Sequence, residues 1–319
     1  WNKRHPTGDS TPGPIKTGFG CAANRWGGGG RGSQARCEIH PDGGVVMRCG
    51  TQDIGTGIRT IIQMITAETL GIPFEAVIPE IGDSVHPFSG GSGGSTTSPS
   101  VSPAIRITAE KARAEFADRL ASELGVDSTD VVVRDGRVLI GEDTSKTMSW
   151  KEACRRLGTE PVSVDGKWER GLSSSGSSGV QLAEVEVDVE TGVTKVKRIA
   201  IVQDCGLVLD PLTAESQVYG GVIMGIGFAL YENRIMDRNT GQMVNPNMEW
   251  YLLPGMSDVP EIDITVVNQP ERGVVGLGEP PTIATAAAIG NAVANATGVR
   301  VRSLPITPDK VLESLDQLF

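Results

Sequence analysis

The chain has 319 residues, of which 39% are hydrophobic and 21% charged, a length and composition that suit a globular protein with a substantial core. Its formal charge of −10 and its 4% of aromatic residues argue against a nucleic-acid partner, because phosphates repel an acidic surface and base stacking needs aromatic rings. No run approaches the roughly 20 consecutive apolar residues that a membrane-spanning helix needs, so no membrane span is expected.

The first part of the chain predicts a linker followed by a hairpin and two helices. Residues 1–16 are rich in proline, glycine and charge, which is typical of a linker. Apolar runs at 34–39 and 45–49 flank Pro41-Asp42-Gly43-Gly44 and predict a β-hairpin. Isoleucines at i, i+3, i+4 and i+7 from Ile58 predict a helix that ends near Gly71. A second helix is predicted from Pro103 to about Leu124.

The second part predicts paired strands and further helices. Ala183, Val185 and Val187 alternate with acidic residues, and the turn at Thr191-Gly192 leads into a strand with three basic residues. Opposite charges paired across these strands would contribute about 0.2–1 kcal/mol each. The remaining predicted elements are a helix at 212–231, a strand at 261–267, an alanine-rich helix at 282–295 and a helix at 308–319. The order predicts an α+β fold of mixed sheets with packed helices, one domain at 17–319 with subdomains at roughly 17–175 and 176–319.

Cysteine and histidine usage gives no protein-held metal site. The five cysteines (Cys21, Cys37, Cys49, Cys154 and Cys205) form no Cys-x-x-Cys pair, and the chain has three histidines. Iron–sulfur and structural zinc sites are therefore not expected in this chain, and Cys205 is interpreted as a small buried hydrophobe. A catalytic metal would have to be held by something other than side chains.

Four glycine-rich segments stand out. They are Trp26–Gly30, Gly50–Gly57, Ser89–Ser98 and Gly276–Pro281. The second and fourth run into predicted helix starts, where free N–H groups and the helix dipole favour anions. They match neither a P-loop nor a dinucleotide fingerprint. From glycine alone, flexible surface loops and a generic nucleotide-phosphate binder both remain open.

The residues around these glycines narrow the choice. Gly50–Gly57 is followed by Ile58-Arg59-Thr60, and later motifs stand in a fixed order. These later motifs are Asp204-Cys205-Gly206 with Asp210-Pro211, Gln217-Val218-Tyr219-Gly220-Gly221, Gly225-Ile226-Gly227, and Gly276-Leu277-Gly278-Glu279-Pro280-Pro281 with Ala286, Ile289 and Asn291. In this order they resemble the xanthine dehydrogenase and aldehyde oxidase family of molybdenum hydroxylases, above all the molybdopterin-binding subunits of bacterial aldehyde oxidoreductases.

The resemblance implies a role for each matching residue. Glu279 would be the catalytic base that removes a proton from the attacking oxygen, and a carboxylate in a closed apolar site suits that task. Trp26 and Arg25 would lie against the substrate. The residues that would contact the cofactor are Gly55, Thr56, Gly57, Gln217, Gly276, Leu277 and Gly278, together with Thr97, Ser98, Ser100 and Ser102 in a Ser/Thr-rich loop.

Each of these residues also has a simpler interpretation. Glu279 could be an acidic residue favoured by the first turn of a helix, and Gln217 could be a solvated helix residue. Trp26 could belong to the core or its rim, and the Ser/Thr-rich segment could be a surface loop. Some relatives carry glutamine where Thr56 stands, so the hydroxyl of Thr56 would have to replace a side-chain amide.

The resemblance also implies the cofactor and partners. A molybdenum ion would be held by molybdopterin, in its cytosine dinucleotide form, with iron–sulfur clusters and FAD in partner chains or domains. Two cofactor-contacting loops of the family, a glycine-phenylalanine loop and an Arg-Gly-x-Gly loop, have no counterpart here. The N-terminal half of the molybdopterin subunit is therefore a further expected partner.

The implied activity is oxidation of an aldehyde or N-heterocycle, a small-molecule substrate, with water as the oxygen source. The alternative is a non-catalytic fragment or scaffold subunit that contributes part of a cofactor cradle. The cytoplasm is the expected compartment, and the periplasm stays open through a partner's export signal.

Overall fold

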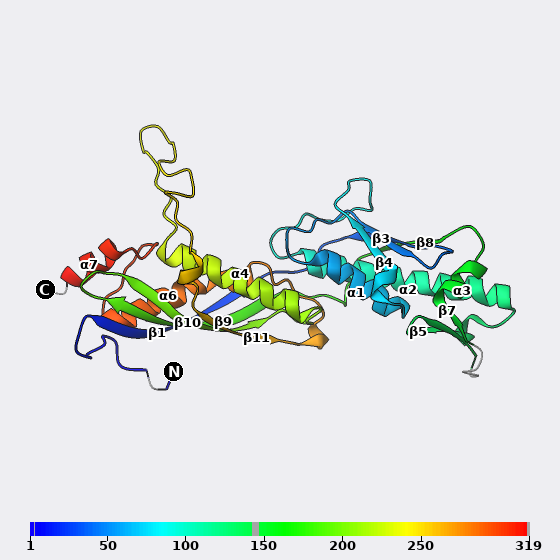
Figure 1. Cartoon of the computed structure of the whole chain (residues 1–319), viewed down its shortest axis with the longest axis horizontal. Coiled ribbons are helices and arrows are strands. Elements are labelled where there is room, and N and C mark those ends of the chain that lie inside the picture. The colour runs from blue at the N-terminus through cyan, green and yellow to red at the C-terminus, as the bar shows by residue number, and fades with distance from the viewer. Residues whose placement is uncertain (3, 142–146, 318–319) are drawn as a thin grey trace. The chain divides into compact units, whose positions relative to one another are not determined.

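The computed structural model describes residues 1–2, 4–141 and 147–317. Within these ranges the chain divides into two compact units (Figure 1). Unit 1 consists of Trp1–Trp26, Ser177–Asn268 and Leu277–Phe319, and unit 2 of Gly27–Gly176 and Gln269–Gly276. The predicted α+β class, mixed sheets with packed helices, is confirmed.

Unit 1 is a four-stranded sheet with helices on one face. The strand order is β1 (Ile15–Trp26), β9 (Ser177–Asp188), β10 (Thr194–Asp204) and β11 (Glu261–Val267). β1 and β10 each pair antiparallel with β9, and β11 pairs parallel with β10. Four helices complete the unit: α4 (Pro211–Leu230), α5 (Pro280–Ile283), α6 (Thr285–Thr297) and α7 (Pro308–Asp316).

The core of unit 1 lies between the sheet, α4 and α6. Ala183, Val185 and Val187 are at most 1% exposed and pack against buried residues of both helices, as their alternation predicted. α6 lies so close to β1 that a Cβ at Gly20 would fall 2.0 Å from the carbonyl oxygen of Ala288. Because Gly18 and Gly20 have no side chains, α6 can lie directly on β1.

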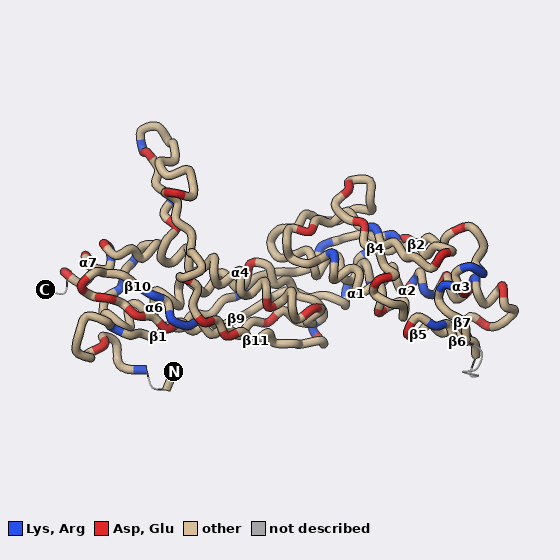
Figure 2. Tube along the Cα trace, viewed as in Figure 1, with Lys and Arg blue, Asp and Glu red and all other residues tan. Residues whose placement is uncertain are grey.

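Charged residues of both signs lie along the strands of this sheet (Figure 2). Lys197 Nζ lies 3.2 Å from Glu186 Oε2, so one predicted ion pair across β9 and β10 is confirmed. Arg198 Nε instead lies 2.5 Å from Asp263 Oδ2 on β11, a strand distant in sequence. These pairs are exposed and screened by solvent, so they contribute little to stability.

Unit 2 contains two sheets and three helices. The larger sheet has the order β4 (Val77–Ile81), β3 (Val45–Cys49), β2 (Gln34–Ile39) and β8 (Val162–Lys167). It packs against α1 (Ile58–Leu70) and α2 (Thr97–Leu124). The smaller sheet is formed by β5 (Val131–Arg134), β6 (Arg137–Ile140) and β7 (Thr147–Ser149), beside α3 (Trp150–Arg156). Trp150 joins α3 to α2 by stacking on Phe116, with ring centroids 4.5 Å apart.

Several predicted elements are confirmed and others are corrected. The hairpin forms with Ile39 opposite Val45, and the first helix ends at Gly71 in the left-handed conformation. α2 begins six residues before the expected Pro103, which lies inside the helix; the carbonyl of Pro99, to which Pro103 cannot donate, accepts the indole N–H of Trp168 at 3.1 Å. The predicted helix at 282–295 is two helices, α5 and α6, that meet at Ala284. α7 covers residues 308–316 of the predicted 308–319, and residues 318–319 lie outside the described ranges.

Candidate functional site

One end of unit 2 gathers the glycine-rich segments. α1 and α2 run side by side in the same direction, because Ser92 before α2 is bonded to Gln52 before α1, and Arg113 of α2 donates to the carbonyl of Thr69 near the end of α1. The N-termini of both helices therefore lie at the same end. This brings Gly55, Thr56 and Gly57 close to the segment that begins at Thr97.

Some of the glycines at this end serve close packing. A Cβ at Gly30 would lie 2.3 Å from the carbonyl oxygen of Pro99, and one at Gly276 would lie 1.6 Å from that of Ser95. The Gly276 N–H donates to the carbonyl of Gly28 at 2.9 Å. In contrast, a Cβ at Gly55, Gly90, Gly91 or Gly93 would meet no heavy atom within 4 Å. This second group, like Gly27, leaves open space beside the backbone.

The start of α1 is capped by the chain's own carboxylate. Asp53 Oδ1 accepts the N–H groups of Gly55 and Gly57 at 3.0 and 3.3 Å, and its Oδ2 accepts that of Arg59 at 3.2 Å. Partial burial alone would raise the pKa of Asp53, but these donors and Thr56 together lower it. These N–H groups therefore already have an anionic acceptor, and a bound anion would compete with Asp53 for them.

The Ser/Thr-rich segment is helical, so the prediction of a loop is wrong. Thr97, Ser98, Ser100 and Ser102 occupy the first turns of α2. The Ser100 hydroxyl donates to the carbonyl of Thr96 at 2.6 Å and accepts the N–H of Arg31 at 2.7 Å. These local bonds satisfy a hydroxyl at a helix start, where backbone partners are available.

Three buried hydroxyl oxygens in unit 2 have no hydrogen-bond partner among the described residues: Thr51 Oγ1, Ser102 Oγ and Ser174 Oγ. Thr51 is fully buried, and Ser102 is 3% exposed. Unsatisfied buried polar groups cost about 1–3 kcal/mol, which a bound polar group or water would offset. Together with the open glycines they fit a polar, hydrogen-bonding ligand, whereas the carboxylate of Asp53 fits an anion less well.

The other predicted residues gather at one end of unit 1. Glu279 is half-buried and stands immediately before α5, and Gln217 is half-buried on α4. One turn beyond Gln217, a Cβ at Gly221 would lie 2.7 Å from Cβ of Pro281, so α4 and α5 are in direct contact. The structure thus places Gln217 on a helix that contacts the one that Glu279 precedes.

Trp26 and Arg25 lie at the same end of unit 1. α6 runs antiparallel to β1, because Gly18 contacts Ala296 whereas Gly20, later in the strand, contacts Ala288, earlier in the helix. α5 precedes α6 and contacts β1, so it lies near the end of the strand that carries Arg25 and Trp26. Both of these side chains are exposed, Trp26 by 37%.

Sequence reasoning missed a buried amide beside α5. Gln181 of β9 is fully buried; its Nε2 donates to the carbonyl of Pro281 at 2.5 Å, and its Oε1 accepts the hydroxyl of Thr285 at 2.7 Å. The sequence carried a sign of it, because Gln181 has the same parity along the strand as the core residues Ala183, Val185 and Val187. A glutamine at a core position requires hydrogen-bond partners.

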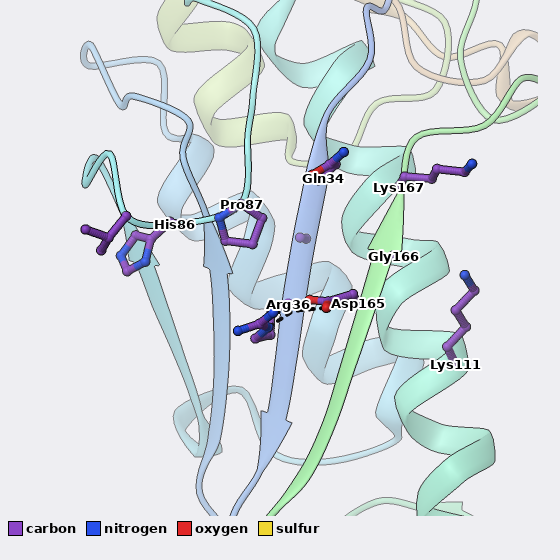
Figure 3. A pocket seen from close by; sticks show the side chains of 10 residues that line it. Gln34, Arg36, His86, Pro87, Lys111, Asp165, Gly166 and Lys167 are labelled. Carbon is purple, nitrogen blue, oxygen red and sulfur yellow. Dashed lines mark hydrogen bonds and ion pairs between the residues drawn. The ribbon is translucent and has the colours of Figure 1, made fainter.

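A separate cavity of about 420 Å³ lies on unit 2 between the sheet and α2. Figure 3 shows Arg36 of β2 joined to Asp165 of β8, with His86 and Pro87 to one side and Lys111 of α2 to the other. No predicted site residue lines this cavity. It therefore adds nothing to the two clusters above.

Metal-ligating side chains are not grouped in the part of the chain that the structure describes: no three His, Cys, Asp or Glu side chains are placed to hold an ion there. Cys205 is 4% exposed, and burial raises the pKa of its thiol to about 11, which confirms its interpretation as a small buried residue. Across the same described ranges, no helix combines the length and apolarity needed to cross a membrane.

Comparison with known proteins identifies relatives along nearly the whole chain. Residues 1–260 match the model of the molybdopterin cofactor-binding domain. The xanthine dehydrogenase molybdenum-binding subunit of Escherichia coli O157:H7 is 32% identical over 98% of this chain and 44% of its own length. The aldehyde oxidoreductase molybdenum-binding subunit PaoC of the same organism is 34% identical over 99% of this chain and 43% of its own length.

A solved structure also matches nearly the whole chain. The quinoline 2-oxidoreductase of Pseudomonas putida 86 superposes with a TM-score of 0.84 and 26% identity over 95% of this chain and 42% of that chain. The chain thus spans less than half the length of the relatives that it matches.

Proposed function

The chain belongs to the molybdopterin cofactor-binding domain family, and from this premise we propose that it forms part of a molybdenum-dependent hydroxylase. The substrate is an aldehyde or an N-heterocycle, and water provides the oxygen atom. The observation that carries the proposal is the placement of Glu279, half-buried before α5 and beside the helix that bears Gln217.

The proposed cofactor is molybdopterin with molybdenum, in the cytosine dinucleotide form. When bound, it would supply the oxidising centre for the two-electron step. The residues that would contact the cofactor are Gly55, Thr56, Gly57, Thr97, Ser98, Ser100, Ser102, Gln217, Gly276, Leu277 and Gly278. The open glycines and the unpaired hydroxyls of Thr51 and Ser102 support a hydrogen-bonding ligand.

Glu279 acts as the base in this proposal. Its carboxylate accepts the proton of the attacking oxygen, and its backbone is held in place because Thr282 N–H donates to its carbonyl at 3.0 Å. The exposed ring of Trp26 offers a surface for stacking on a planar substrate, and Arg25 beside it a charged contact.

Partner chains with iron–sulfur clusters and FAD would take the electrons away, and the N-terminal half of the molybdopterin subunit would complete the cofactor cradle. The segment between α4 and β11 projects from unit 1 (Figure 1), and its exposed apolar side chains support a protein partner. Val244, Met248, Trp250 and Met256 of this segment are 61%, 75%, 66% and 96% exposed. The Asn245 side chain donates to the carbonyl of Asn233 and accepts the N–H of Ile235, and these hydrogen bonds stabilise the conformation of the segment.

The test is the assembled enzyme with Glu279→Gln. We expect aldehyde-dependent dye reduction to fall by about 10²–10⁴-fold, because a general base contributes about that much, while molybdenum and pterin content stay unchanged. Glu184→Gln, on the solvent side of β9, is the matched control and should keep full turnover.

Three outcomes would contradict the proposal. Unchanged turnover in Glu279→Gln would refute the base. Assembly that stays intact without molybdenum in wild type would favour a scaffold subunit. Retention on an immobilised nucleotide by the molybdenum-free chain would favour a generic nucleotide-phosphate binder.

A further inference from the structure

We propose that Gln181 is a positioning residue for Glu279, a role that rests on the proposed function of Glu279 as the base. Gln181 lies on β9, far from Glu279 in sequence, and belongs to none of the sequence motifs described above. Its two hydrogen-bond partners, Pro281 and Thr285, both lie just after Glu279 in sequence.

The strand puts this amide in the core. Gln181 points to the same face as Ala183 and Val185, and all three are at most 1% exposed. A buried amide without hydrogen-bond partners is destabilising, so the bonds of Gln181 determine where its neighbours lie. Its Nε2 donates to the carbonyl of Pro281, and its Oε1 accepts the hydroxyl of Thr285.

The segment that carries Glu279 needs such support. α5 has four residues, too few to be a stable helix by itself, and it is separated from α6 at Ala284. Gln181 bonds the carbonyl of Pro281 in α5 and the first residue of α6, and so holds the two helices across the break. It thereby fixes the turn that starts at Glu279.

α4 closes the opposite side of this turn. A Cβ at Gly221 would lie 3.1 Å from the backbone nitrogen of Thr282, and a Cβ at Gly225 would lie 2.3 Å from Cβ of Thr285. The turn is therefore confined between a glycine surface of α4 and the Gln181 amide. A loss of the amide bonds would release it toward the strand, and a shift of about 1 Å in a catalytic group can cost about 10²-fold in rate.

Gln203 of β10 provides a matched comparison. It is also fully buried, and its Nε2 donates to Ser177 Oγ at 2.9 Å and to the carbonyl of Ser178 at 3.0 Å. These partners belong to the sheet itself. A buried amide with a purely structural role would behave like Gln203.

The first experiment compares Gln181→Met with Gln203→Met in the assembled enzyme. We expect kcat to fall about 10–100-fold in Gln181→Met with KM and molybdenum content unchanged, whereas Gln203→Met keeps kcat. Hydrogen exchange of residues 279–285, measured by mass spectrometry, should be faster only in Gln181→Met. Equal kcat in the two variants would overturn the proposal.

A second pair of variants keeps the test valid if Gln181→Met folds poorly. Thr285→Val removes the hydroxyl bond at nearly constant volume, and Thr285→Ser keeps the hydroxyl. Turnover lost in Thr285→Val should largely be retained in Thr285→Ser; an equal loss in both would refute the bond's role. If Glu279→Gln keeps full turnover, the base itself is wrong. If only Glu279→Gln loses turnover, the positioning role alone fails.

Discussion

Alanine in place of Gly20 would force a methyl group into the backbone of α6. The Cβ would lie 2.0 Å from the oxygen of Ala288 and 2.3 Å from the nitrogen of Ala292. Ordinary contacts of a Cβ begin at 3.4 Å, so α6 would have to move from β1 by about 1.4 Å. Both obstructing atoms are backbone, so no side-chain rotation can relieve the contact.

The cost follows from this geometry. Overpacking a core costs about 1–3 kcal/mol where side chains can adjust, and a helix held on its other side by α4 cannot adjust as easily. We expect Gly20→Ala to lower the free energy of unfolding by about 3 kcal/mol or more, a large part of a total of about 5–15 kcal/mol.

Gly290→Ala on the same helix is the matched control. Its Cβ would meet only Ile306 Cδ1 at 3.7 Å, an ordinary contact, and alanine favours a helix over glycine by about 0.5–1 kcal/mol. Urea unfolding followed by circular dichroism should show opposite shifts of the midpoint for the two variants. A Gly20→Ala midpoint equal to wild type would refute the close-contact argument.

Three further predictions concern charge, thiols and the exposed segment. The pKa of Asp53 is lowered in the folded state, so the ionised carboxylate stabilises the fold above the unfolded pKa of about 3.9, and this stabilisation is lost as the pH falls through and below that value. The difference in urea midpoint between wild type and Asp53→Asn should therefore become smaller below about pH 4. Burial raises the pKa of Cys37 and Cys154 to about 12, so iodoacetamide at pH 8 should leave both unmodified in the native protein and alkylate both in urea, as read by mass spectrometry; native alkylation would contradict their burial. Asn245→Ala removes the bonds that brace the segment between α4 and β11, so limited proteolysis there should be faster, and an unchanged cleavage rate would show that other contacts hold it.

The sequence alone determined what depends on local pattern. The hairpin at 34–49 followed from its turn residues, and α1 from the spacing of its isoleucines, because both are set by neighbours in the chain. The ordered motifs determined the family, since side-chain identity at a site is written directly in the sequence. Glu279 stood out for the same reason.

Only the tertiary structure decided which distant residues meet. β1 was not predicted as a strand, because its pairing partner is β9, more than 150 residues later, and its glycines are explained only by the helix lying on them. The Ser/Thr-rich segment is a helix because packing outweighs weak local propensity. The sequence could not show that Asp53 occupies the donors of its own loop, or that Gln181 reaches Pro281 across 100 residues. Such bonds depend on where folding brings the strands and helices, and no local pattern records that.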